Sequence, residues 1–196
     1  MNFESAKTYI LERLGRELPD HLTYHGFHHT LEVYRNAQNY AEYYDIKGDD
    51  LDLLLTGALY HDSGFLRTYQ DHEVKGCELV REMLPKFEYG NAEIEAVCGM
   101  IMSTKIPQEP ANLMEEIICD SDLDYLGRDD FYSIGNELYL EFFHMGIVKD
   151  EQSWNELQVR FLESHHYHTE FALKNRLEIK EKHLQHLRNL VASYNN

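Results

Sequence analysis

The stretch LLLTGALYHDSGF, residues 53–65, runs from a strongly apolar segment directly into the adjacent pair His61 and Asp62. Its apolar residues recur at spacings of three and four, which is the spacing of one face of an α-helix. Ionisable side chains at the end of a core-facing stripe are costly to bury unless they are paired or bind a metal. The same His-Asp dipeptide also occurs at helix ends where the helix dipole favours the histidine and the aspartate is solvated. A metal site therefore needs further evidence from other parts of the chain.

Two other segments connect an apolar stripe to an ionisable residue. In residues 28–45, His29 starts a stripe that Val33 continues one turn later. In residues 112–124, a stripe of leucine, methionine and isoleucine leads to Asp122. These patterns predict three helices that each direct a potential metal ligand towards the interior.

The composition favours a protein built from helices. Only 4 prolines and 11 glycines occur among 196 residues, and they fall between the amphipathic segments, as helix punctuation does. No segment shows the sustained polar–apolar alternation of a strand. The sequence therefore predicts an all-α fold, a single-domain helical array over residues 1–196. Helices are expected at about residues 3–17, 28–45, 49–62, 71–84, 91–105, 112–124, 128–145, 151–164 and 167–193.

Charge and cysteine content narrow the functional classes. The formal net charge of −17 repels nucleic-acid backbones and argues against binding a nucleic-acid polymer, although a small phosphorylated substrate stays possible beside a bound cation. Cys77, Cys98 and Cys119 lie in apolar stretches and are expected to be buried free thiols in a reducing compartment.

No signal peptide is recognisable, and the longest apolar run is too short to span a membrane. We therefore expect a cytoplasmic protein.

Two motifs flank the central pair, YHGFHHTLEV at residues 24–33 and CDSDLDYLG at residues 119–127. In this order the three motifs resemble the HD superfamily of metal-dependent phosphohydrolases, in particular its small bacterial single-domain members. The resemblance covers about residues 20–127 and extends through residues 154–169. It implies a metal site at the core of the helices, with the C-terminal helices of residues 128–196 packed on the metal-motif core. The ligands that it implies for one metal ion are His29, His61, Asp62 and Asp122.

Three histidines compete for the first ligand position. His28 shares a helix face with polar residues and is expected to face water, whereas His29 starts the apolar stripe. The family pattern Tyr-His-x-x-x-His also favours His29. His25 occupies the position that resembles a leaving-group proton donor in cyclic-nucleotide phosphodiesterases; alternatively it is a loop histidine bonded to a backbone carbonyl.

Three aspartates compete for the last ligand position. Asp122 follows Ile118 by four residues and precedes a leucine, as the family's aspartate does. Asp120 and Asp124 are expected to be solvated or capping carboxylates. We therefore assign the ligand to Asp122.

A set of two histidines and two aspartates mixes imidazole nitrogen with carboxylate oxygen, so it fits Fe, Mn, Co, Ni, Zn or Mg. An octahedral ion on four protein ligands keeps two positions open for water and a phosphate oxygen. Such an ion polarises phosphorus and helps its bound water to lose a proton near neutral pH. We expect one divalent transition metal or Mg, and a catalytic Asp62 that also orients the water.

His72 and Glu73 begin the segment of residues 71–84. Glu73 lies on the apolar stripe of that segment and is a candidate general base or acid, or a first-turn glutamate favoured by the helix dipole. Some HD nucleotidases carry a glutamate shortly after the His-Asp pair, which this chain lacks, and Glu73 could replace it. His72 is a candidate for substrate binding or for a second metal. Residues 100–105 contain no further histidine, which favours a single metal.

Two cations are candidates for binding a substrate phosphate. Lys105 lies at the end of the apolar stripe of residues 91–105, and Arg67 follows the His-Asp motif. The structural alternatives are a snorkelling lysine and a surface arginine. The histidine-rich run of residues 165–168 is interpreted as a helix junction with exposed or hydrogen-bonded histidines, and the amphipathic last helix could support a homodimer.

The sequence predicts a metal-dependent phosphohydrolase, a phosphomonoesterase or phosphodiesterase acting on a small phosphate ester such as a nucleotide or related metabolite. The alternative is a ligand-binding or regulatory module on the same fold with little or no turnover, because fold does not determine function. A third possibility, an HD-type oxygenase, would normally require more histidine ligands than we can place.

Overall fold

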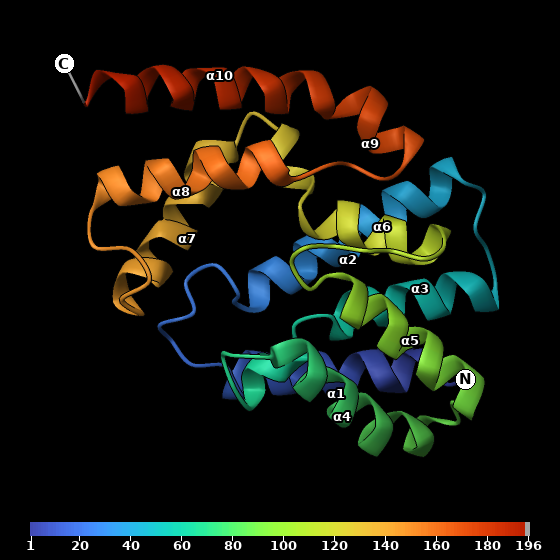
Figure 1. The fold of residues 1–196 in the computed structure, drawn as a ribbon. Helices are drawn as coiled ribbons and strands as arrows, with labels where there is room; N and C mark the ends of the chain where they lie inside the picture. The colour runs from blue at the N-terminus through green and yellow to red at the C-terminus, as the bar shows by residue number, and fades with distance from the viewer. Residues whose placement is uncertain (195–196) are drawn as a thin grey trace. The chain divides into compact units, whose positions relative to one another are not determined.

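The computed structural model describes residues 1–194, which fold into helices joined by short loops (Figure 1). No strand occurs within this described part, so the prediction of an all-α fold is confirmed. None of its helices is long and apolar enough to cross a membrane. The α-helices are α1 (Phe3–Glu17), α2 (Phe27–Tyr43), α3 (Asp49–Tyr60), α4 (His72–Met83), α5 (Asn91–Ser103), α6 (Leu113–Asp122), α7 (Phe131–His144), α8 (Glu151–Ser164), α9 (Glu170–Asn175) and α10 (Leu177–Ser193). Three 3-10 turns complete the order: η1 (Ser63–Leu66), η2 (Leu84–Phe87) and η3 (Asp124–Gly127).

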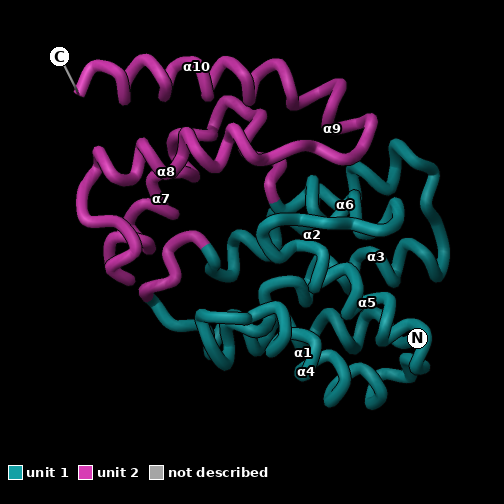
Figure 2. The backbone as a smooth tube through the Cα atoms, viewed as in Figure 1, with its two compact units in different colours: residues 1–20, 25–122 teal, residues 21–24, 123–196 magenta. Residues whose placement is uncertain are grey.

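The chain divides into two compact units (Figure 2). Unit 1 comprises residues 1–20 and 25–122, and unit 2 comprises residues 21–24 and the chain from Leu123 onward. The single domain over residues 1–196 and the packing of the C-terminal helices on the metal-motif core stay predictions.

Helix α3 is the centre of unit 1, where it packs against α1, α2, α5 and α6. Every residue from Leu54 to Tyr60 is buried, as expected for a helix that is apolar on nearly all sides. Its polar groups are satisfied: the Tyr60 hydroxyl donates to the Ala6 carbonyl oxygen at 3.0 Å, and the Thr56 and Tyr89 hydroxyls are 2.7 Å apart. This is why a run of apolar residues precedes the His-Asp pair, which the helix carries into the interior of the unit.

Unit 2 is built on α7 to α10, and α8 packs against α10 (Figure 1). The predicted helix of residues 167–193 is wrong as one element, because it breaks into α9 and α10 at Arg176, whose φ of −122° is not helical. The break follows from packing. Gly127 lies so close to the Arg176 backbone that a Cβ there would come within 2.7 Å of the Arg176 Cα, and the Arg176 guanidinium binds Asp124 at 2.9 Å.

Candidate metal centre

The end of α3 places the His-Asp pair. His61 caps the helix with an αR backbone and a fully buried side chain, and Asp62 follows it at the start of η1. The His61 Nδ1–H donates to the carbonyl oxygen of Ala58 at 2.8 Å. Since a carbonyl only accepts, this bond fixes the tautomer and leaves the Nε2 lone pair of His61 available to a metal.

Helices α2 and α6 pack together and supply the two other ligand candidates. His29 is the third residue of α2 and its side chain is buried, while Asp122 is the last residue of α6 and partly exposed. Two turns after His29 on the same helix, Asn36 donates from Nδ2 to the carbonyl oxygen of Ser121 at 3.0 Å. This buried hydrogen bond holds the end of α6, and therefore Asp122, against α2.

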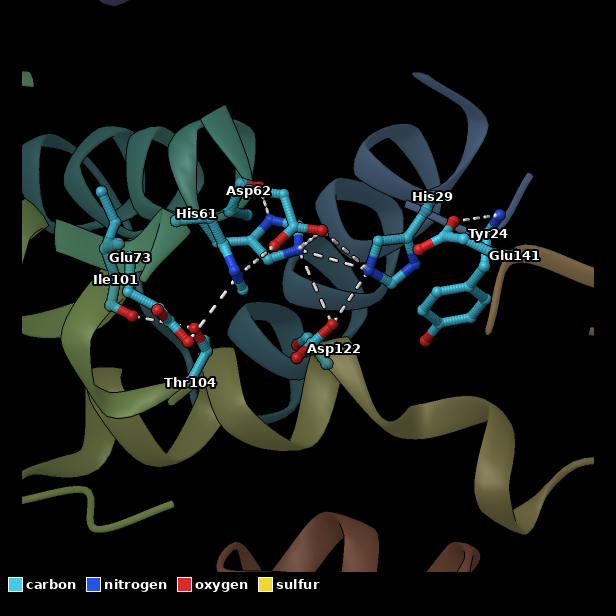
Figure 3. A network of polar contacts seen from close by, with 12 residues as sticks. Tyr24, His29, His61, Asp62, Glu73, Ile101, Thr104, Asp122 and Glu141 are labelled. Carbon is cyan, nitrogen blue, oxygen red and sulfur yellow. Dashed lines mark hydrogen bonds and ion pairs between the residues drawn. The ribbon is translucent and has the colours of Figure 1, made fainter. Parts of the chain in front are cut away.

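The side chains of His29, His61 and Asp122 converge from three helices (Figure 3). The His29 Nε2 lies 2.9 Å from Asp122 Oδ1 and 3.3 Å from His61 Nε2. The His61 Nε2 lies 3.6 Å from the same Asp122 oxygen. Metal–nitrogen and metal–oxygen bonds of about 2.1 Å put neighbouring ligand atoms roughly 3 Å apart, so these separations suit one ion.

Asp62 lies beside this group of three. Its Oδ2 is 3.2 Å from His61 Nε2 and 3.6 Å from His29 Nε2. This oxygen is buried and has no hydrogen-bond partner within the described chain. A buried carboxylate oxygen without a partner is strongly disfavoured, and a bound cation would satisfy it. The arrangement therefore fits a divalent ion held by two imidazoles and up to two carboxylates.

Electrostatics show why the cluster needs a cation. Burial by itself lowers the pKa of His61, but the negative charges of Asp62 and Asp122 raise it to about 9. Burial would raise the pKa of Asp62, yet His61 and His72 hold that pKa well below its usual value. The carboxylates thus attract positive charge to this place, and a divalent cation would supply it while leaving the imidazoles neutral.

The turn η1 brings His72 to the second oxygen of Asp62. Gly64 lies so close to the start of α4 that a Cβ there would come within 2.6 Å of the His72 carbonyl carbon. This contact lets the Phe65 and His72 rings stack with their centroids 4.0 Å apart. The His72 Nε2 then lies 3.4 Å from Asp62 Oδ1, and its side chain is 20% exposed.

The two other predicted catalytic residues lie in the same region. The His25 ring centroid is 4.6 Å from that of Phe65 and 6.1 Å from that of His29. Glu73 is buried, as its position on the stripe predicted, and its Oε1 lies 3.7 Å from His72 Nε2. The catalytic roles of these residues stay predictions.

The two predicted phosphate-binding cations are engaged by surface carboxylates instead of pointing at the cluster. Lys105 is nearly half exposed and its Nζ lies 2.8 Å from Asp71 Oδ1. Arg67 donates to Glu82 at 2.6 Å from Nη2. Their place in substrate binding is untested, and the present contacts match the snorkelling and surface alternatives.

Burial distinguishes the histidines and aspartates that compete for the first and last ligand positions. His28 is exposed, as the facing argument predicted for it. The expectation that Asp120 and Asp124 are solvated or capping is wrong, because both are buried, Asp120 lies inside α6, and the residue at the N-cap of η3 is Leu123. In unit 2, Asp124 pairs with Arg176 and Arg128, at 2.9 and 3.5 Å. Arg176 is 52 residues from Asp124 in the sequence, so local pattern could not reveal this pair, whereas Arg128 follows Asp124 by four residues.

Two residues that position the site were missed from the sequence. Asn36 had a recognisable signal, because it is a polar residue on the buried face two turns after His29. The sequence signal for Phe65 was weaker, since an aromatic residue after the His-Asp pair is equally consistent with simple core packing. Neither residue is a ligand, and both fix elements that carry ligand candidates.

The HD domain family model matches residues 26–127, just over half of the chain, and this match contains all four predicted ligands. The chain belongs to the HD domain family. No curated protein and no solved structure matches it. As an HD domain protein, the chain has the all-α fold expected of the family, and its group of His29, His61 and Asp122 could hold a metal ion.

Proposed function

We propose that this HD domain protein is a metal-dependent phosphohydrolase that cleaves a phosphate ester of a small molecule, such as a nucleotide or a related metabolite. The observation that carries the proposal is the convergence of His29, His61 and Asp122 beside the buried Oδ2 of Asp62, which has no hydrogen-bond partner within the described chain. Membership of the HD family supports the same chemistry. The metal would be one divalent ion, either a transition metal or Mg.

A bound divalent ion supplies positive charge that polarises a phosphoryl oxygen and makes water a better nucleophile near neutral pH. His29, His61 and Asp122 would hold it, and Asp62 would complete the set with Oδ2. The other oxygen of Asp62 faces His72 at 3.4 Å, so one carboxylate links the ligand group to a partly exposed imidazole. In this arrangement Asp62 orients a water molecule on the side of the site where His72 lies.

His72, Glu73 and His25 would handle protons and the substrate. His72 is exposed enough to meet a phosphate oxygen, and the ring of Phe65 stacked on it limits its rotation. Glu73 stands behind His72 at 3.7 Å, where it can orient the imidazole. The ring of His25 lies on the same Phe65, which places a second imidazole near the leaving group in this account.

The overall charge of −17 favours a small substrate. An extended polyanion would meet repulsion from the acidic surface, whereas a single phosphate ester needs only the local field of the bound ion. We therefore place nucleic-acid polymers outside the substrate class.

The test is a screen of nucleotides and generic phosphomonoesters and phosphodiesters with added Mn, Co, Ni or Mg. We expect metal-dependent release of phosphate or alcohol, and a loss of kcat of at least about a hundredfold in Asp122→Asn and Asp62→Asn. The matched control is Asp50→Asn, because Asp50 is an exposed aspartate in the first turn of α3. Folded Asp122→Asn and Asp62→Asn proteins with full activity and full metal content would overturn the proposal. Tight ligand binding without turnover across the screen would favour the regulatory module instead.

A further inference from the structure

Unit 2 contains a cavity of about 410 Å³ that lies apart from the metal-ligand candidates in the sequence. It is lined by residues from the end of α8, from residues 165–167, from α9 and from α10 as far as Arg188. This volume is in the range of sites for small ligands. The lining that matters here consists of Leu162, Leu173, Leu177, Leu184, His165 and Lys180.

Lys180 supplies a buried positive charge in this lining. Only 2% of the residue is exposed, and the ammonium group donates to the backbone carbonyl oxygen of His165. No carboxylate of the described chain lies within ion-pair distance of it. Burial lowers the pKa of Lys180, and besides the carbonyl the ammonium has the face of the Tyr167 ring, whose centroid is 5.8 Å from Nζ. Two of its three N–H groups are therefore available to an acceptor that is not part of unit 2.

His165 gives a second, independent sign that the cavity is incomplete. The residue is more than nine-tenths buried, and neither ring nitrogen has a hydrogen-bond partner in residues 1–194. Its ring stands edge-on to Tyr167 with the centroids 4.8 Å apart. Buried polar groups are normally satisfied by protein, water or ligand, so a cavity lined by two under-satisfied groups points to an occupant.

The neighbouring charges leave Lys180 as the cation that an occupant would meet. Arg188 also lines the cavity, but its guanidinium donates to Glu163 at 2.8 and 3.0 Å, and the two charges offset each other. Glu181 is exposed, so water screens its charge. The remaining buried charge is a single positive one, which a monoanion would balance and a phosphate dianion would exceed.

We propose that this cavity binds a small amphipathic carboxylate, whose head pairs with the Lys180 ammonium and whose alkyl chain lies against the four leucines. The two free N–H groups of the ammonium match the two oxygens of a carboxylate. The leucines give the alkyl chain a dry surface, because burying it there removes apolar area from water. The site does not depend on the metal centre, and its ligand would be an effector or a carried metabolite.

Isothermal titration calorimetry of the full chain with octanoate tests the proposal, with 1-octanol, octylamine and inorganic phosphate as comparison probes. We expect octanoate to bind with a dissociation constant below about 1 mM and each comparison probe to bind at least about tenfold more weakly. Lys180→Met should weaken octanoate at least about tenfold. Lys182→Met is the matched control, because Lys182 is an exposed lysine of the same helix that pairs with Glu178.

Leu173→Trp provides a second variant in case Lys180→Met does not fold. Leu173 is 45% exposed at the edge of the cavity, so the larger ring can obstruct entry without disturbing a buried charge. We expect it to weaken octanoate by at least about tenfold. The proposal is overturned if octanoate fails to bind, if folded Lys180→Met or Leu173→Trp binds it as the wild type does, or if 1-octanol, octylamine or phosphate binds as tightly.

Discussion

The contact between Gly64 and the start of α4 predicts a large effect for a single added methyl group. In Gly64→Ala, the new Cβ would lie 2.6 Å from the His72 carbonyl carbon, 2.8 Å from the Gly76 nitrogen, and closer still to the His72 carbonyl oxygen. All three are backbone atoms of α4, so no side-chain rotation can relieve the overlap. Either η1 or the first turn of α4 has to move.

The size of the effect follows from these distances. Unstrained carbon contacts lie at about 3.5 to 4.0 Å, so relieving the contact with the His72 carbonyl carbon separates the two backbones by roughly 1 Å, and the closer contact with the carbonyl oxygen requires more. Overpacking of this kind costs about 1 to 3 kcal/mol when side chains can adjust, and we expect about 3 kcal/mol here because backbone must shift. Asp62 and His72 stand on the two moving segments, so affinity for a divalent metal should fall at least about tenfold.

Urea unfolding and metal titration of Gly64→Ala measure both effects. The control is Gly15→Ala in α1, where the new Cβ would meet only the Phe27 ring at 3.9 Å. Because alanine has the higher helix propensity, Gly15→Ala should raise the free energy of unfolding by about 0.5 to 1 kcal/mol. The reasoning is refuted if Gly64→Ala unfolds within about 0.5 kcal/mol of the wild type, or if it binds metal with unchanged affinity.

Three further predictions concern single side chains. Asp124→Asn removes a buried charge paired with two arginines, and should lower the free energy of unfolding by about 2 kcal/mol; an unchanged urea midpoint would contradict this. Burial lowers the pKa of His165 from 6.5 to about 3. Between these pH values the unfolded state binds a proton that the folded state does not, so the free energy of unfolding should fall as the pH drops, by up to about 1.4 kcal/mol per pH unit. His165→Phe should remove this part of the slope, and identical stability profiles from pH 6.5 to 3 would refute it. Tyr60→Phe removes the hydrogen bond to the Ala6 carbonyl and should cost about 1 kcal/mol in thermal unfolding, whereas an equal or higher Tm would contradict that role.

Much of unit 1 could be predicted because its pattern is local. The apolar spacing before His61 identified a buried helix, and the facing of His29 against His28 agrees with their burial. Helix α1, and in unit 2 helix α8, begin and end where the sequence predicted, since polar caps and loop residues mark their ends. In such segments, periodicity and capping carry most of the information.

What could not be predicted depends on contacts between residues far apart in the sequence. The break between α9 and α10 at Arg176 comes from its contacts with η3, which no local propensity reveals. Asp124 looks like a loop carboxylate in the sequence and becomes buried through two arginines. Lys105 ends an apolar stripe, yet the backbone turns after α5 and its long side chain reaches Asp71 at the surface.

The central claim is that His29, His61 and Asp122 hold a divalent metal, and metal content measures it most directly. Wild-type protein loaded with Mn, Co or Ni and then desalted should retain about one equivalent per chain by elemental analysis. His29→Gln should bind the metal at least about tenfold more weakly, while His28→Gln, which changes the exposed neighbour, should match the wild type. The account is contradicted if folded His29→Gln retains the wild-type metal content, or if His28→Gln is the variant that loses it.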